Sequence, residues 1–115
     1  MASNGAGVSL GSSGYFIMSG GTIQYNCGYS NTGGVLVMNN NFTMTGGTIQ
    51  YNVGKNFGGI GIAGSQPNMS GTPVVRDNVI FNHVSQTNTH ITKTDSGYTL
   101  EAGGTPCDVK HATAN

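Results

Sequence analysis

Short runs in which apolar and polar residues alternate recur at a fixed interval along the chain. Three of these runs have Ile or Val at the centre and Asn two residues beyond their end: residues 22–24, 48–50 and 74–76. Successive side chains of a β-strand point to opposite faces, so this alternation is typical of short strands. The pattern predicts strands whose central residues, Ile23, Ile49 and Val75, point inward. Their polar neighbours would point outward: Gln24, Gln50 and Arg76.

The asparagines that follow these runs, Asn26, Asn52 and Asn78, lie 26 residues apart. A second motif, Gly-Gly followed by apolar residues, occupies residues 33–37 and 58–62. A repeat of roughly 20 to 50 residues indicates a solenoid or a propeller, and a propeller blade needs about 40 residues for four strands. The unit also lacks the Leu ladder of a leucine-rich repeat. The sequence therefore predicts an all-β fold, a parallel β-helix (β-solenoid) of three to four coils of about 26 residues.

Stacked coils would place equivalent residues directly above one another, about 4.8 Å apart. Asn26, Asn52 and Asn78 would then form a buried ladder of side-chain amides at a corner, where Asn tolerates left-handed backbone angles. The Gly-Gly pairs are expected at bends that need positive φ. Residues 35–37 are apolar on both faces, so alternation leaves the inward face of this strand open, and a Leu36 that points outward would be an ordinary exposed side chain.

The regular coils are expected over residues 1–82, and an irregular last coil with a C-terminal cap over residues 83–115. Residues 98–105 follow the pattern of residues 42–48 with one insertion, which suggests a degenerate further copy of the repeat. The polar segment 85–95 carries the extra length, and we expect a loop or an altered coil there.

The Gly-Gly-Thr-Ile blocks at residues 20–23 and 46–49, each followed by Gln-Tyr-Asn, resemble the Gly-Gly-Ala-Ile and Phe-x-x-Asn repeats of chlamydial polymorphic outer-membrane proteins. They are also similar to repeats in autotransporter passengers and in Gram-positive surface proteins. The resemblance covers roughly residues 5–82. It implies a right-handed parallel β-helix, exposure on a bacterial surface, and a role in adhesion or as a rigid stalk. Repeats of this kind specify a fold better than a task.

Charged residues make up 7% of the 115 residues, and four basic side chains balance four acidic ones. A balanced chain offers no basic surface for nucleic acid or an anionic membrane, so we expect neither partner. No apolar run approaches the roughly 20 residues that span a bilayer, so we expect no membrane insertion by this segment. Residues 1–14 lack the features of a signal peptide. We expect a fragment of a longer protein that is secreted or held at the cell surface.

The two cysteines allow two interpretations. Cys27 occupies the repeat position of Val53 and Val79, which favours a buried thiol in an apolar ladder. A disulfide with Cys107 is the alternative, because an exported protein with two cysteines permits one.

Residues of metal-ligand type gather in the irregular C-terminal part: His83, His90, Cys107, Asp108 and His111. They match no zinc-finger spacing and no His-Glu-x-x-His helix. We therefore expect solvated loop side chains, with no metal site and no cofactor.

Polysaccharide-degrading β-helices need clustered carboxylates for acid and base catalysis. Asp77 is the one carboxylate in a clear coil, and strand alternation places Arg76 on the side opposite to it. We expect no enzymatic activity. A row of Thr residues, such as Thr22 and Thr48, could bind ice, but the row ends at Val74.

Tyr25, Tyr51 and Asp77 directly precede the three asparagines and are expected to face solvent or a turn. Exposed Tyr rings can stack on a sugar, because one side of the ring is apolar surface and its hydroxyl is polar. These three residues are therefore the candidate ligand-binding residues, for a glycan or a host-surface ligand. A pair of Tyr rings that merely covers a corner is the alternative.

The ends of a stack of coils expose strand edges, which can pair with another chain. The N-terminal edge has no obvious cap, so we expect either that further coils precede it in the parent protein or that two copies meet there, as a homo-oligomer formed through exposed coil ends. The function we expect is that of a structural repeat module of a bacterial surface or secreted protein, as a stalk or in adhesion. A carbohydrate-binding or polysaccharide-degrading β-helix protein is the alternative.

Overall fold

The structure, a computed structural model, describes residues 7–10, 15–29, 31–37, 42–63, 67–84, 90–95 and 97–111. Within these residues every regular element is a β-strand. The expectation of an all-β chain is therefore confirmed.

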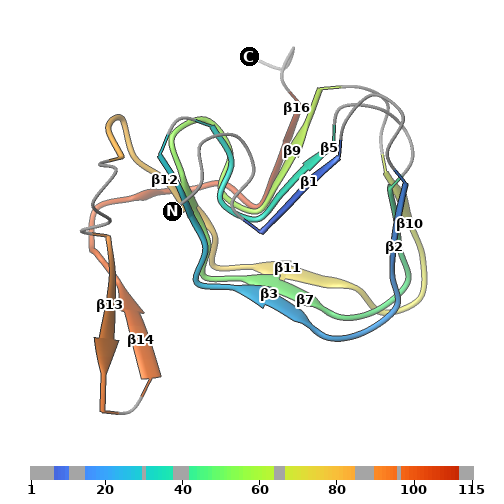
Figure 1. Cartoon of the computed structure of the whole chain (residues 1–115), viewed down its shortest axis with the longest axis horizontal. Coiled ribbons are helices and arrows are strands. Elements are labelled where there is room, and N and C mark those ends of the chain that lie inside the picture. Colours follow the sequence, from blue (N-terminus) through green and yellow to red (C-terminus); the bar gives the residue numbers. More distant parts are fainter. Residues whose placement is uncertain are drawn as a thin grey trace.

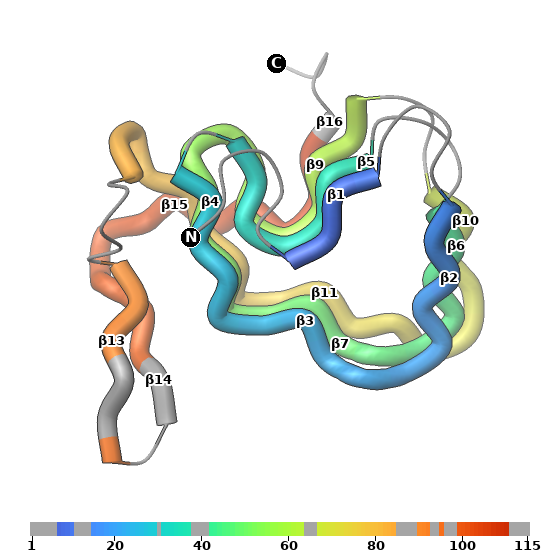
Figure 2. Tube along the Cα trace, viewed as in Figure 1, coloured from blue at the N-terminus to red at the C-terminus, as the bar shows by residue number. Residues whose placement is uncertain are grey.

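The strands repeat in groups of four, because the chain runs around the same circuit three times (Figures 1 and 2). We call each circuit a rung. Rung 1 contains β1 (Val8–Leu10), β2 (Phe16–Met18), β3 (Thr22–Gln24) and β4 (Cys27–Gly28). Rung 2 contains β5 (Val35–Val37), β6 (Phe42–Met44), β7 (Thr48–Gln50) and β8 (Val53–Gly54). Rung 3 contains β9 (Ile60–Ile62), β10 (Asn68–Met69), β11 (Val74–Arg76) and β12 (Val79–Ile80).

Equivalent strands of successive rungs pair in parallel and form four sheets. The sheets contain, in order, β1-β5-β9, β2-β6-β10, β3-β7-β11 and β4-β8-β12. Ile23 pairs with Ile49, and Ile49 pairs with Val75. The 26-residue repeat seen in the sequence is therefore the offset between paired residues in β2-β6, β3-β7-β11 and β4-β8-β12, as predicted, whereas the offset is 27 for β1-β5 and 25 for β5-β9 and β6-β10. It also stacks the rings of Phe16 and Phe42, whose centroids are 5.4 Å apart.

The inward-facing residues of the rungs form one apolar core. Its buried members are Leu10, Met18, Val35, Val37, Phe42, Met44, Ile49, Ile60 and Ile62. Ile49 in rung 2 is fully buried, whereas Ile23 and Val75 in the outer rungs are partly buried. The middle rung is covered from both sides, so its residues gain the largest hydrophobic stabilisation, about 1.5–3 kcal/mol for each large side chain.

The corner before each Asn has a left-handed backbone, but the residue in that conformation is not the Asn. Tyr25, Tyr51 and Asp77 have φ of 58°, 54° and 55°. The prediction that Asn supplies the left-handed angle is therefore wrong. A non-glycine residue in this region costs about 1–2 kcal/mol, and here the turn directs the next side chain, the Asn amide, into the interior.

The two kinds of Gly-Gly pair have different roles. Gly21 and Gly47 have positive φ of 78° and 86°, as expected for bends. Gly34 has no such angle, but a Cβ there would lie 2.4 Å from the Gly59 carbonyl oxygen of the next rung. At this second site the prediction of positive φ is wrong, and the reason for glycine is the close approach of two backbone segments.

Leu36 is buried, so it is not the exposed side chain that an outward orientation alone would give. Its neighbour in the sheet is Gly61, and a Cβ on Gly61 would lie 2.5 Å from the Phe57 ring. Phe57 is itself buried and forms a parallel bridge with Thr32. The connections from β4 to β5 and from β8 to β9 thus fold over the outer face of this sheet (Figure 1). Alternation alone does not reveal this second layer.

The C-terminal segment leaves the circuit. A hairpin of β13 (Ile91–Thr94) and β14 (Gly97–Leu100) projects from the stack, and β15 (Thr105–Pro106) pairs antiparallel with β12 (Figure 1). Only β16 (Val109–His111) returns to the repeat, in parallel with β9. Residues 98–105 are therefore not a further copy of the repeat, and the expected loop at 85–95 contains β13, while 85–89 lie outside the described residues.

Candidate functional site

A groove runs along the corner that precedes the three asparagines. It is lined by Tyr25, Tyr51, Asp77, Val79, Thr99 and Leu100, and it has a volume of about 410 Å³. The first three are equivalent positions on successive rungs, and the last two belong to β14 of the hairpin. The structure thus brings together all three residues that the sequence analysis proposed for ligand binding. The hairpin wall was not predicted, because it lies outside the repeat.

The two tyrosines stack on each other. The centroids of the Tyr25 and Tyr51 rings are 5.6 Å apart, and the ring planes differ by 6°. The Arg76 guanidinium lies over the Tyr51 ring, 5.7 Å from its centroid, at cation–π distance. One face of the Tyr51 ring is therefore against Tyr25 and the other is against Arg76. A ligand in the groove would meet the edge and the hydroxyl group of this ring.

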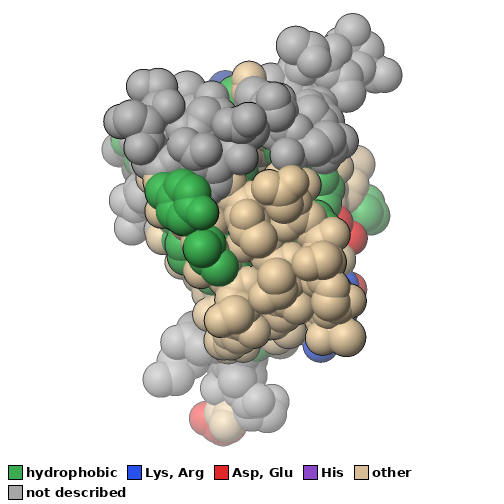
Figure 3. Space-filling model, turned by 90° about the vertical axis from the view of Figure 1, so that its right-hand side faces the viewer, with side chains coloured by type: hydrophobic (Ala, Val, Ile, Leu, Met, Phe, Trp, Pro, Cys, Tyr) green, Lys and Arg blue, Asp and Glu red, His purple; other side chains and the backbone are tan. Residues whose placement is uncertain are grey.

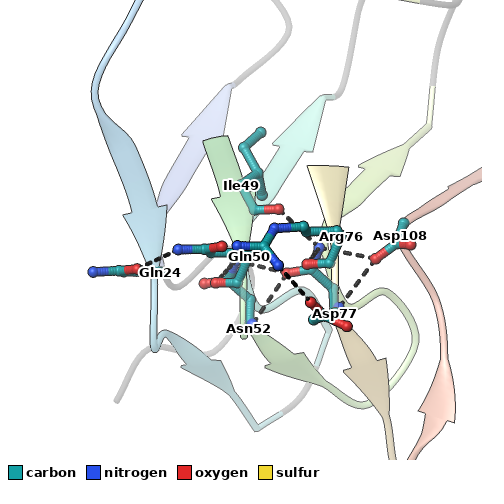
Figure 4. A network of polar contacts seen from close by, with 8 residues as sticks. Gln24, Ile49, Gln50, Asn52, Arg76, Asp77 and Asp108 are labelled. Carbon is teal, nitrogen blue, oxygen red and sulfur yellow. Dashed lines mark hydrogen bonds and ion pairs between the residues drawn. The ribbon is translucent and has the colours of Figure 1, made fainter. Parts of the chain in front are cut away.

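Arg76 also pairs with Asp77. The Arg76 Nη1 and Asp77 Oδ2 atoms are 3.2 Å apart, and both side chains are about half exposed (Figure 4). The prediction that they point to opposite sides is wrong, because the left-handed angle at Asp77 interrupts the alternation of the strand. An exposed pair of this kind adds at most about 1 kcal/mol to stability. The Asp77 carboxylate consequently remains accessible from the groove.

Behind the groove, the asparagines form the expected ladder. The backbone N–H and Nδ2 of Asn26 both donate to Asn52 Oδ1, at 3.1 and 3.0 Å. Asn52 donates in the same way to Asn78 Oδ1, at 3.0 and 2.8 Å. The side chains of Asn52 and Asn78 are buried. Each buried amide is satisfied by its neighbours, so the ladder holds successive rungs in one register.

Asp108 accepts the last bonds of the ladder. Its Oδ1 receives the backbone N–H and the Nδ2 of Asn78, both at 3.0 Å (Figure 4). Sequence analysis placed Asp108 among scattered residues of metal-ligand type and missed this role. Its distance from Asn78 along the chain is 30 residues, so the 26-residue repeat gives no signal for it.

The hairpin that forms one wall of the groove is tied to the stack. His90 Nδ1 lies 2.6 Å from Glu101 Oε2, and the His90 ring lies 4.3 Å from the Phe81 ring between centroids. His90 is buried, so the prediction of a solvated loop side chain is wrong for this residue. Leu100 and Ile91 pack against a second apolar cluster on the β4-β8-β12 sheet. These contacts fix the position of Thr99 and Leu100 beside the corner.

Cys27 belongs to that second cluster. It is buried, it pairs with Val53 in the sheet, and its thiol is free. Burial raises the pKa of the Cys27 thiol to about 11. Cys107 is partly buried and also free. The prediction of a buried thiol in an apolar ladder is confirmed, and the alternative of a disulfide is not what the structure contains.

The remaining residues of metal-ligand type do not converge. Within the described residues, no three His, Cys, Asp or Glu side chains lie close enough to hold one metal ion. His83 is exposed, and the side chain of His111 lies outside the described part of the chain. In the same described part, no helix is long and apolar enough to cross a membrane.

Comparisons of the chain with protein family models, with curated proteins and with solved structures find no match. The argument for a function therefore depends on the geometry of the groove and of the stack.

Proposed function

We propose that this chain is a right-handed parallel β-helix that serves as a structural repeat module of a bacterial surface or secreted protein, with a role in adhesion. In this proposal the stacked rungs are a rigid support, and the groove beside Asp77 is the recognition surface for a glycan. The parallel pairing of equivalent strands in four sheets, with offsets of 25 to 27 residues, supports the fold. The resemblance to repeats of bacterial surface proteins supports the location.

The groove is the observation that carries the role in adhesion. Its wall combines apolar surface from Val79 and Leu100 with the Asp77 carboxylate and the exposed Thr99. Small-molecule sites are commonly concave and mostly apolar, with a few polar groups that fix the orientation of the ligand. A sugar ring presents apolar C–H faces and hydroxyl groups, so it matches both kinds of surface. Asp77 can accept hydrogen bonds from sugar hydroxyls, and these charge-assisted bonds are stronger than neutral ones.

The same geometry favours binding over hydrolysis. Glycoside hydrolysis uses two carboxylates on opposite sides of the scissile bond. Asp77 is the one carboxylate among the residues that line the groove. The Oδ1 atom of Asp108 is occupied by the ladder. We therefore favour the function of a carbohydrate-binding module over that of a polysaccharide-degrading enzyme.

Binding to immobilised glycans tests the proposal. Purified chain should bind a subset of neutral or acidic oligosaccharides, and Asp77→Asn should weaken that binding about tenfold, because a hydrogen bond to a charged group is worth about 1.5–3 kcal/mol. The matched control is Asp95→Asn, which removes an exposed carboxylate at the tip of the hairpin, outside the groove. Absence of glycan binding, or equal binding by both variants and the natural chain, would contradict the proposal that the groove binds a glycan.

A further inference from the structure

The two ends of the stack differ in charge. Residues 1–54 contain no Asp, Glu, Lys or Arg, and the first charged side chain is Lys55. Rung 1 and the strands of rung 2 therefore carry no charge, whereas every charged residue lies in the remainder of the chain. Proteins commonly protect exposed strand edges with charged side chains, proline or bulges. The end formed by rung 1, which we call the N-terminal end, has none of these in its four strands.

The backbone of this end offers unpaired hydrogen-bonding groups. In the sheets, the amides of equivalent residues in rungs 2 and 3 donate toward the preceding rung: Thr45 to Met18, Ser70 to Met44, Thr48 to Gly21 and Val74 to Gly47, at 2.9–3.1 Å. By the same register, the amides of Ser19 and Thr22 point away from rung 2. Within the described residues, no strand lies on that side of β1, β2, β3 or β4. These edges can therefore pair with a further strand.

Apolar surface accompanies these edges. A groove of about 460 Å³ is lined by the consecutive residues 16–23 of rung 1. Tyr15, just before this segment, is 71% exposed, and Ile17, within it, is 55% exposed. Figure 3 shows hydrophobic side chains at the border of the face formed by β2, β6 and β10 on the β2 side, and others at the opposite border. Uncharged edges beside exposed apolar residues are the features of an interaction surface.

The opposite end also has exposed apolar residues, since Met69, Val74 and Val109 are 40–47% exposed, but it carries features that hinder strand pairing. Pro67 directly precedes β10 and Pro73 directly precedes β11, and proline removes a backbone donor from a strand. Arg76 and Asp77 add exposed charges at the end of β11. β15 contains Pro106 and covers β12 in the antiparallel direction. These features limit pairing at this end.

The protected end also excludes head-to-tail stacking. β15 and β16 lie on β12 and β9, one level beyond rung 3. Rung 1 of a second copy, placed on rung 3, would need that same level for its own β4 and β1. Two copies can therefore not extend the stack in the parallel direction. A contact between the same N-terminal end of two copies, by contrast, is free of proline and charge in its four strands and closes on itself as a two-fold dimer.

We propose that the N-terminal end is a self-association surface, on which a second copy docks through its own rung 1 and forms a closed dimer. The outer edge of β2 pairs with the same edge of the partner in the antiparallel direction, and Ile17 lies beside the two-fold axis. The absence of charge through residue 54 means that no like charges oppose this contact. The proposal does not depend on glycan binding.

Sedimentation velocity of the full chain over a wide concentration range tests this. The natural chain should pass from monomer to dimer and no further. Ile17→Lys should remain monomeric, because it sets two like charges against each other across the axis. The matched control is Val74→Lys, a substitution of similar chemistry at the opposite end, where Val74 is 40% exposed. This control should dimerise like the natural chain.

A mixture of Ile17→Lys and Ile17→Glu separates a true interface from misfolding. Each variant alone should be monomeric, and the two together should form a 1:1 dimer, because opposite charges then meet across the axis. A natural chain that stays monomeric at all concentrations overturns the proposal. So does growth beyond the dimer, dissociation caused by Val74→Lys, or a mixture that fails to associate while both variants keep the circular dichroism of the natural chain.

Discussion

Removal of the Asn52 side chain should destabilise the fold far more than removal of the Asn26 side chain, although both belong to one ladder. Asn52 is fully buried. Its Oδ1 is the acceptor for the backbone N–H of Asn26, and its Nδ2 donates to the carbonyl oxygens of Ile23 and Gln50 and to Asn78 Oδ1. Asn52→Ala leaves these partners without the amide and opens a small cavity.

The magnitude follows from the number of partners that are lost. An unsatisfied buried polar group costs about 1–3 kcal/mol, so Asn52→Ala should cost about 3 kcal/mol in total. In Asn26→Ala the backbone N–H still donates to Asn52 Oδ1, and the lost bonds are those of Nδ2 to Gln24 and Asn52, in partly exposed surroundings. That loss should be about 1 kcal/mol. For a domain stable by about 5–15 kcal/mol, the difference is easily measured.

Urea unfolding followed by far-ultraviolet circular dichroism is the assay. Both variants should keep the same dependence of the unfolding free energy on urea concentration, and the midpoint of Asn52→Ala should be clearly lower. Equal losses of stability in the two variants would refute the reasoning, because they would mean that the buried ladder contributes no more than its exposed end.

Two further predictions concern single positions. Cys27→Val should reduce the loss of stability at alkaline pH, because the pKa of the Cys27 thiol is about 11 in the folded chain and has the ordinary value of 9.0 in the unfolded chain. Ionisation of the unfolded thiol therefore lowers the free energy of unfolding of the natural chain by up to about 3 kcal/mol as the pH rises from 9 to 11. Urea unfolding at pH 7, 9 and 10.5 measures this loss. An equal slope with pH in both proteins would contradict this. Gly21→Ala should lower the free energy of unfolding by about 1 kcal/mol in thermal or urea unfolding, because φ is 78° at this residue. Gly20→Ala should be nearly neutral, because Gly20 has no positive φ and a Cβ there would meet open space. Equal losses in the two variants would show that backbone strain is not the cause.

The repeated part of the fold could be predicted because it is encoded by residues that face equivalent residues. Ile23, Ile49 and Val75 share one environment, so the same residue type recurs at the interval that becomes the sheet register. The same logic placed Tyr25 and Tyr51 in one row. The grouping of this row into a groove could be foreseen only in part, because the other wall comes from a hairpin that occurs once.

The errors share a physical cause. The burial of Leu36 could not be foreseen because alternation describes two faces of one sheet, and it contains no information on a second layer such as the one that Phe57 forms. The left-handed angle was assigned to Asn from its intrinsic preference, whereas burial of the amide requires the preceding residue to turn. Tyr25 therefore bears the strain, and tertiary hydrogen bonds override the local preference.

The ladder also has a direction, and this direction makes the two ends of the stack chemically different. Each Asn donates two hydrogen bonds toward the following rung and, except for the first, accepts two from the preceding one. A ladder of this kind must finish on an acceptor, and Asp108 provides it; a carboxylate has no N–H group with which to continue the series. At the other end, no described residue donates to Asn26 Oδ1. Within the described residues the ladder therefore ends at Asp108, and β15 and β16 lie beyond rung 3, while rung 1 keeps an open acceptor and uncharged strand edges. This chemical difference between the two ends is what favours the proposed contact through rung 1.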